Sequence, residues 1–72
     1  MSHATVKAIL VSEVVKMIAE HDHINEEEAL DRFYASATAE NLADDETGLY
    51  GQSALYIYGL FLEEEDYAHK TL

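Results

Sequence analysis

The chain has 72 residues, which is enough for one small domain and no more. It contains no cysteine, which excludes disulfides and thiolate metal sites, and 49% of its residues are hydrophobic, too many for a disordered chain. Fifteen acidic residues against four lysines and arginines give a formal net charge of −11, which disfavours direct binding of nucleic acids and of anionic membranes.

Neither the apolar stretches nor the first residues indicate a membrane or secreted protein. No stretch reaches the roughly 18 apolar residues of a membrane-spanning helix. The opening residues Met-Ser-His-Ala-Thr lack the basic region and apolar core of a signal peptide. We therefore expect a cytoplasmic protein that does not bind membranes.

The first apolar segment, residues 5–20, predicts an amphipathic helix. Placed at 100° per residue, its apolar side chains cover an arc of roughly 220°, wider than contact with one neighbouring helix requires. Several of its residues are β-branched, so a strand is the alternative, but the segment is longer than a normal strand and has no breaker. We expect this helix either at the centre of the domain or shared with another subunit.

The next segment carries the clearest helix start in the chain. Asn25 is suited to accept free N–H groups at a helix start, and Glu28 stands three residues later, as in a capping box. Acidic residues in the first turn also complement the helix dipole. We predict a helix over residues 26–37, while residues 38–42 either continue it or form a separate turn.

A third helix is predicted over residues 49–64, after a polar loop at residues 44–48. Gly59 falls in its interior, where glycine costs about 1 kcal/mol relative to alanine, and close approach of another backbone would explain its presence. The acidic run at residues 63–66 opposes the helix dipole. We therefore expect the helix end to fray and residues 67–72 to form a loosely ordered tail.

These segments predict an all-α fold in one domain over residues 1–66. We expect a three-helix bundle without a sheet, or a four-helix bundle if a short turn near residues 39–43 is helical. The apolar faces of the second and third helices are expected to pack against the first helix. The residues expected at these contacts are Phe33, Tyr34, Ile57 and Phe61.

The candidates for metal binding are two histidines in the turn after the first helix. His21 and His23 flank Asp22, and histidine with carboxylate can bind zinc or nickel. No further ligands stand at a fixed ligand spacing, so we expect exposed loop histidines and neither metal nor cofactor. The acidic loop at residues 44–48 lacks the alternating oxygen ligands and closing glutamate of a calcium-binding loop.

No residue pattern predicts catalysis. An acid/base pair needs one carboxylate in an apolar pocket, and each Asp and Glu here falls on a polar helix face, at a helix end or in a loop. The serines lack a nucleophile-elbow context, and the glycines do not form a phosphate-binding loop. We expect no enzymatic activity and assign no catalytic residues.

Five tyrosines are the most suggestive feature, because tyrosine is enriched at protein interfaces. We expect Tyr50 and Tyr58 at the rim of the core and Tyr56 at an interface. In the predicted third helix, Leu49, Tyr56 and Leu60 lie on one line, at i, i+7 and i+11, and an exposed apolar line of this kind usually marks an interface. The predicted interface comprises Ile9, Leu49, Tyr56 and Leu60.

Three runs of residues resemble a family of short, uncharacterised bacterial helical proteins, known only as a domain of unknown function. They are Ile-Asn-Glu-Glu-Glu-Ala-Leu-Asp-Arg-Phe-Tyr at 24–34, Asp-Glu-Thr-Gly-Leu-Tyr-Gly-Gln-Ser at 45–53 and Leu-Tyr-Ile-Tyr-Gly-Leu-Phe-Leu-Glu-Glu-Glu at 55–65. The chain departs from the family near Ala39, where members tend to carry an aromatic residue, and near Ala54, where they tend to carry proline. The resemblance implies a small helical cytoplasmic protein. Some members are encoded beside toxin-like proteins, which implies an antitoxin-like or accessory role.

The sequence therefore favours a non-catalytic, acidic protein-interaction module with a basic protein partner. We also expect a homodimer, because self-association would cover the predicted interface and add the core that so short a chain lacks. One alternative function is a homo-oligomeric structural domain. A metal or small-ligand binder that uses the histidines is a further alternative.

Overall fold

The computed structural model describes residues 3–70, and within this range it contains helices and no strand. The α-helices are α1 (His3–Asp22), α2 (Glu26–Tyr34), α3 (Ala37–Ala43) and α4 (Ala54–Lys70). The 3-10 turns η1 (Asp45–Thr47) and η2 (Leu49–Gly51) connect α3 to α4. The predicted all-α class is confirmed, and the first helix covers the predicted residues 5–20.

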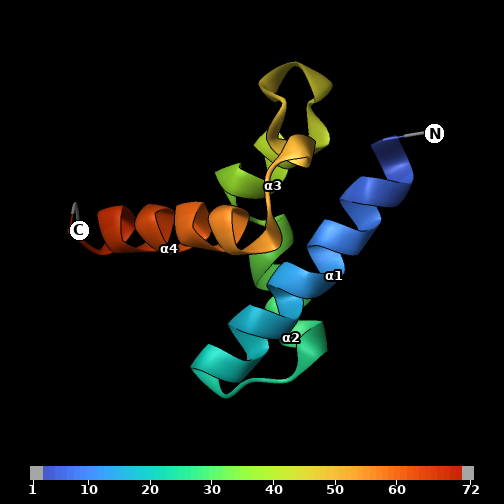
Figure 1. Cartoon of the computed structure of the whole chain (residues 1–72). Helices are drawn as coiled ribbons and strands as arrows, with labels where there is room; N and C mark the ends of the chain where they lie inside the picture. The colour runs from blue at the N-terminus through green and yellow to red at the C-terminus, as the bar shows by residue number, and fades with distance from the viewer. Residues whose placement is uncertain (1–2, 71–72) are drawn as a thin grey trace.

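The chain reverses between α1 and α2 through a left-handed turn. His23 has a φ of +57°, and the Ile24 N–H donates to the Ala19 carbonyl at 3.1 Å, which is the longer bond of a Schellman motif. The side chain of Asn25 then accepts a hydrogen bond from the Glu28 N–H at 2.8 Å and caps α2 as predicted. As a result α1 and α2 lie side by side and run in opposite directions (Figure 1).

A serine separates α2 from α3. The Ser36 hydroxyl donates to the Phe33 carbonyl at 2.5 Å and accepts from the Ala39 N–H at 3.1 Å. The same side chain therefore ends α2 and caps α3. Of the two possibilities left open for residues 38–42, the structure has the separate helical turn.

The predicted start of the third helix at Leu49 is wrong, because α4 begins at Ala54. Gly48 adopts a left-handed φ of +67°, and η2 is a short 3-10 turn rather than the first turn of a long helix. The Ser53 hydroxyl then accepts a hydrogen bond from the Tyr56 N–H at 3.1 Å. Helix α4 consequently starts from a cap of its own.

At its other end α4 continues to Lys70, through residues that were expected to form a loose tail. Two carboxylates of the acidic run are bound by other helices: Glu65 by Arg32 of α2 and Glu64 by Thr38 of α3. These contacts offset the unfavourable interaction of the carboxylates with the helix dipole. Lys70 lies 3.1 Å from Asp66, and the basic last turn complements the helix dipole. Residues 71–72 lie outside the described range.

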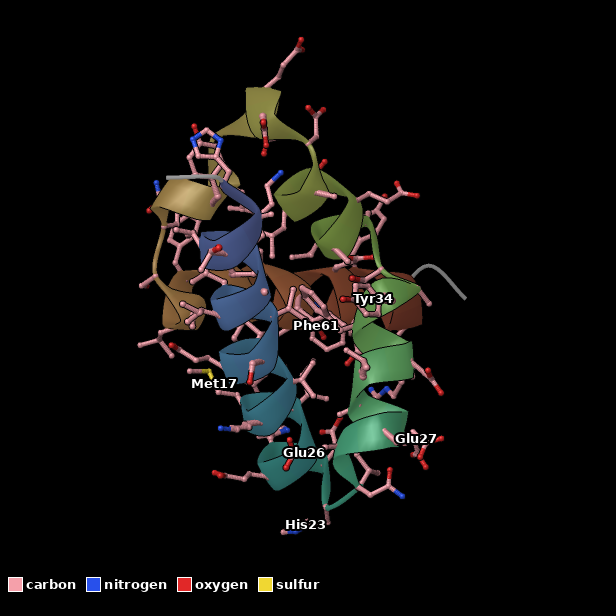
Figure 2. The ribbon with its side chains drawn as sticks, turned by 90° about the vertical axis from the view of Figure 1, so that its right-hand side faces the viewer. Met17, His23, Glu26, Glu27, Tyr34 and Phe61 are labelled. Carbon is pink, nitrogen blue, oxygen red and sulfur yellow. The ribbon has the colours of Figure 1, made fainter. Side chains whose placement is uncertain are left out.

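The core lies where α1, α2 and α4 meet. Phe33, Ile57 and Phe61 are fully buried, as predicted, and the rings of Phe33 and Phe61 lie 5.9 Å apart. Tyr34, expected in the same core, is instead 61% exposed. Figure 2 shows the reason: α1 and α2 lie in front, α4 lies behind them, and Tyr34 is on the side away from α4.

Candidate functional site

A groove runs along the face of α1 that is turned away from α4. Its upper part, about 300 Å³, lies between α1, the end of α2 and α3, and its lower part, about 390 Å³, lies between α1 and the first half of α2. Ala8 and Val11 line both parts, so the two depressions adjoin along α1, and together they are called here the α1 groove. None of its lining residues belongs to α4.

Apolar side chains line most of the α1 groove. They are Val11, Val15, Leu30, Phe33, Ala39 and Leu42. Phe33 and Leu42 are fully buried members of the core, whereas Val11 and Leu30 are half-buried and only packed against it. A ligand in the groove would therefore contact Val11 and Leu30 together with the exposed Ala4 and Ala8, which lie over the buried core.

The two edges of the α1 groove differ in charge. On the α2 edge, Glu26 and Glu27 line the lower part, Tyr34 lines the upper part, and Asp31 lies exposed one turn after Glu27. Figure 2 shows Glu26, Glu27 and Tyr34 along this side of the molecule. On the α1 edge, Ala4, Ala8 and Ser12 carry no charge, and Lys7 lines the upper part. The α2 edge is therefore acidic.

A polar cluster closes the upper end of the α1 groove. Lys7 donates to the Ala43 carbonyl at 2.7 Å and forms an ion pair with Asp45, whose pKa this contact lowers, with a smaller contribution from His3. The rings of His3 and Tyr50 stack with centroids 3.9 Å apart. These contacts hold the loop after α3 against the start of α1, and Tyr50 lies half-buried at the rim of the core, as expected.

The predicted interface of Ile9, Leu49, Tyr56 and Leu60 does not form one surface. Leu49 is 7% exposed and belongs to the core, because η2 folds it inward, so its place in the interface is a wrong prediction. Ile9 is 54% exposed, but the residues one turn away on either side of it, Thr5 and Glu13, are exposed and polar.

The remaining pair of that interface does lie together on α4. Tyr56 is 52% exposed and Leu60 is half-buried one turn later. Leu60 lines a shallow depression of about 450 Å³ with Tyr67 and residues of α3. This side of α4, formed by Tyr56, Leu60 and Tyr67 and called here the α4 flank, is a second apolar surface.

An arginine joins three helices on the far side of the core. Arg32 donates from Nη1 to Asp22 at 2.6 Å and from Nη2 to both carboxylate oxygens of Glu65, at 3.0 and 2.7 Å. The hydrogen bond to Glu65 is the main cause of the raised pKa of Arg32. A hydrogen bond with His21, followed by the contacts with Arg32, lowers the pKa of Asp22. These paired charges join α1, α2 and α4 on the side of the core away from the α1 groove.

Tyr58 lies beside this cluster. It is half-buried, as expected for the rim of the core, but its hydroxyl is buried and has no hydrogen-bond partner among residues 3–70. Its ring meets that of His21 edge-on at 6.4 Å. Burial, with the nearby charges of Asp22 and Glu65, raises the pKa of Tyr58.

Glu64 caps α3 from another helix. Its carboxylate accepts hydrogen bonds from the Ala37 N–H at 2.8 Å, the Thr38 N–H at 2.9 Å and the Thr38 hydroxyl at 2.8 Å. Burial alone would raise its pKa, but these hydrogen bonds bring the pKa of Glu64 below its ordinary value. The acidic run that predicted fraying thus supplies an anchor between α3 and α4.

The two candidate metal-binding histidines lie apart from further ligands. His21 and His23 are both exposed, and the Nδ1 of His21 lies 2.8 Å from a carboxylate oxygen of Asp22. Within residues 3–70, no three His, Asp or Glu side chains gather where they could hold a metal ion. The acidic loop after α3 uses Asp44 to cap η1 and Asp45 to pair with Lys7.

The sequence contained one signal for the α1 groove. The apolar arc of the first helix is wider than one contact needs, and Ala8, Val11 and Val15 are the part of it that faces the groove. The exposure of Tyr34 had no such signal, since its position in the sequence equally suits a core residue.

Comparison of the chain with protein-family models, with curated proteins and with solved structures finds no match. The resemblance to a family of bacterial helical proteins therefore stays a prediction. None of the helices in residues 3–70 combines the length and apolar character needed to cross a lipid bilayer.

Proposed function

We propose that this chain is a non-catalytic protein-interaction module that binds a basic partner protein through the α1 groove. The observation that carries the proposal is the groove itself, a mainly apolar depression over the core that no helix within residues 3–70 covers. Exposed apolar surface of this kind usually marks an interface, and an exposed tyrosine at its edge is a typical interface anchor.

Charge supports a basic partner. The chain has a formal net charge of −11, Glu26 and Glu27 line the groove, and Asp31 lies exposed one turn after Glu27 on α2. Such a surface attracts and orients basic proteins and repels acidic ones. An accessory or antitoxin-like subunit in the cytoplasm, the role that the family resemblance implies, would act through contacts of this kind.

Site-specific photocrosslinking in the native host tests the proposal. A photoreactive phenylalanine analogue would replace Tyr34 at the α1 groove and, in a matched control, Tyr56 on the α4 flank, since both rings are more than half exposed. We expect position 34 to give an adduct with a protein whose crosslinked segment is basic, and position 56 to give none. Adducts at position 56 alone would contradict the proposal.

A homo-oligomeric structural domain is the second candidate, favoured by the exposed Tyr56 and the half-buried Leu60 on the α4 flank. Light scattering of the wild type at high concentration, beside Tyr56→Ser and Tyr34→Ser, separates the candidates. A dimer that Tyr56→Ser alone dissociates would assign self-association to the α4 flank. A wild type that stays monomeric would remove this candidate.

A further inference from the structure

We infer that the occupant of the α1 groove is an amphipathic α-helix with lysines or arginines along one side of its polar face. This inference rests on the proposed function and specifies the partner of the same site. It follows from three properties of the groove: its length, the size of the residues at its α1 edge, and the position of its charges.

The groove has the length of a short helix. It follows α1 from Ala4 to Val15, a distance of about 16 Å at the helical rise of 1.5 Å per residue, or about three turns. Its two parts, of about 300 and 390 Å³, meet at Ala8 and Val11. A helix that lies along α1 would place apolar side chains spaced at i, i+3, i+4 and i+7 into both parts in turn, whereas a single small ligand would fill one part.

The α1 edge allows a helix to come close. Ala4, Ala8 and Ser12 stand one turn apart along this edge. Small side chains at successive turns let the backbone of a second helix approach within the usual packing distance. The half-buried Val11 and Leu30 between the edges would then lose their remaining contact with water.

The charges place the basic side of the bound helix. Glu27 and Asp31 lie one turn apart on the exposed side of α2, and no hydrogen bond or ion pair engages either carboxylate within residues 3–70. Both are free to pair with incoming cations. The nearest cation in the groove, Lys7, is already held by Asp45 and Ala43. The bound helix would therefore present its basic side chains to α2 and uncharged ones to α1.

A second copy of the chain suits the groove poorly. Each copy would bring a net charge of −11 and four basic Lys and Arg residues in all. Of these, Lys7, Arg32 and Lys70 are already engaged in ion pairs. Like charges facing each other across an interface reduce affinity, so the partner is a different, basic chain.

Two synthetic peptides test the inference. Both have about fifteen residues with leucines on one helical face; one carries lysines on the polar face and the other carries glutamates at the same positions. Binding to the full chain is measured by fluorescence anisotropy at physiological salt. We expect the lysine peptide to bind the wild type and the glutamate peptide not to bind.

Matched variants locate the binding. Tyr34→Ser at the groove is paired with Tyr56→Ser on the α4 flank. The double variant Glu27→Lys/Asp31→Lys on the α2 edge is paired with Glu13→Lys/Glu20→Lys, which changes the net charge equally on exposed positions of α1 that do not line the groove. We expect each groove variant to weaken binding of the lysine peptide at least about tenfold and each control to change it less than about twofold.

The charge-reversed groove also supplies a test that loss of folding cannot mimic. Glu27→Lys/Asp31→Lys is expected to gain binding of the glutamate peptide, which an unfolded protein would not do. Equal weakening by both charge pairs would show diffuse attraction and overturn the inference, as would failure of the lysine peptide to bind. If the lysine peptide does not bind but crosslinking from position 34 captures a basic partner, the proposed function is supported and the inference that the ligand is a helix is wrong.

Discussion

The buried hydroxyl of Tyr58 is expected to reduce the stability of this small core. It has no hydrogen-bond partner among residues 3–70, and a buried polar group left unpaired costs about 1–3 kcal/mol. Tyr58→Phe is therefore expected to raise the free energy of unfolding by about 1 kcal/mol in urea denaturation. Tyr56→Phe, on an exposed ring, is the control and should stay within about 0.5 kcal/mol of the wild type. A less stable Tyr58→Phe would contradict the account.

Gly59 is a second residue at which the chain is less stable than it could be. The sequence suggested that another backbone lies close to it, but a Cβ at Gly59 would meet no atom within 4 Å, so that explanation fails within the described chain. Gly59→Ala should raise the free energy of unfolding by about 1 kcal/mol, because alanine favours the helix. Gly48→Ala is the opposite control: Gly48 has a left-handed φ, so this variant should be less stable than the wild type. Both are read from urea denaturation, and a Gly59→Ala protein less stable than the wild type would contradict the prediction.

Glu64 gives the stability of the fold a specific pH dependence. Its folded-state pKa lies below the ordinary 4.5, so the stabilisation is complete above that value and is lost as pH falls through the folded pKa. At neutral pH, we expect the free energy of unfolding of the wild type to be about 1 kcal/mol higher than that of Glu64→Gln. The difference should shrink as pH drops below about 4.5, when urea denaturation of both proteins is compared across pH. Taking the difference removes the effect of the other carboxylates, and a difference independent of pH would refute this role.

At the scale of the helices, Arg32 is the contact that fastens α4 to the α1–α2 pair. Its partners are about one quarter to one third exposed, at 26% for Asp22 and 35% for Glu65. Replacing Arg32 with Met should lower the free energy of unfolding by about 1–2 kcal/mol, between the values for exposed and buried pairs. Arg32→Lys should recover only part of this, because lysine cannot bind two carboxylates with a planar fork. If Arg32→Met and the wild type were equally stable in urea denaturation, the ion pairs of Arg32 would not stabilise the fold.

The helices that were predicted well are those whose ends are encoded locally. Asn25 caps α2 in the sequence and in the structure, and the length of the first apolar segment decided helix against strand. The ends of α4 depend on contacts between distant residues. Arg32 and the start of α3 bind the carboxylates that local reasoning counted as destabilising, and the left-handed Gly48 separates Leu49 from the helix assigned to it.

At the scale of the whole molecule, the structure is the antiparallel pair of α1 and α2 with α4 packed against one side of it. Its principal extents are 39 × 26 × 17 Å, and α4 lies behind α1 and α2 in Figure 2 while the other side carries the α1 groove. The sequence showed that the first helix has more apolar surface than one contact can bury. It could not show where the surplus would lie, because that depends on the side at which α4 packs. Half of the predicted interface, Tyr56 and Leu60, remains on the α4 flank.

Amide chemical-shift mapping tests most directly whether the α1 groove is the binding surface. Isotope-labelled protein would be titrated with the lysine peptide and followed in ¹H–¹⁵N spectra. We predict that the largest changes fall on Ala8, Val11, Leu30 and Tyr34, with little change along the outer side of α4. Changes concentrated on Tyr56, Leu60 and Tyr67 would contradict the claim and move the binding surface to the α4 flank.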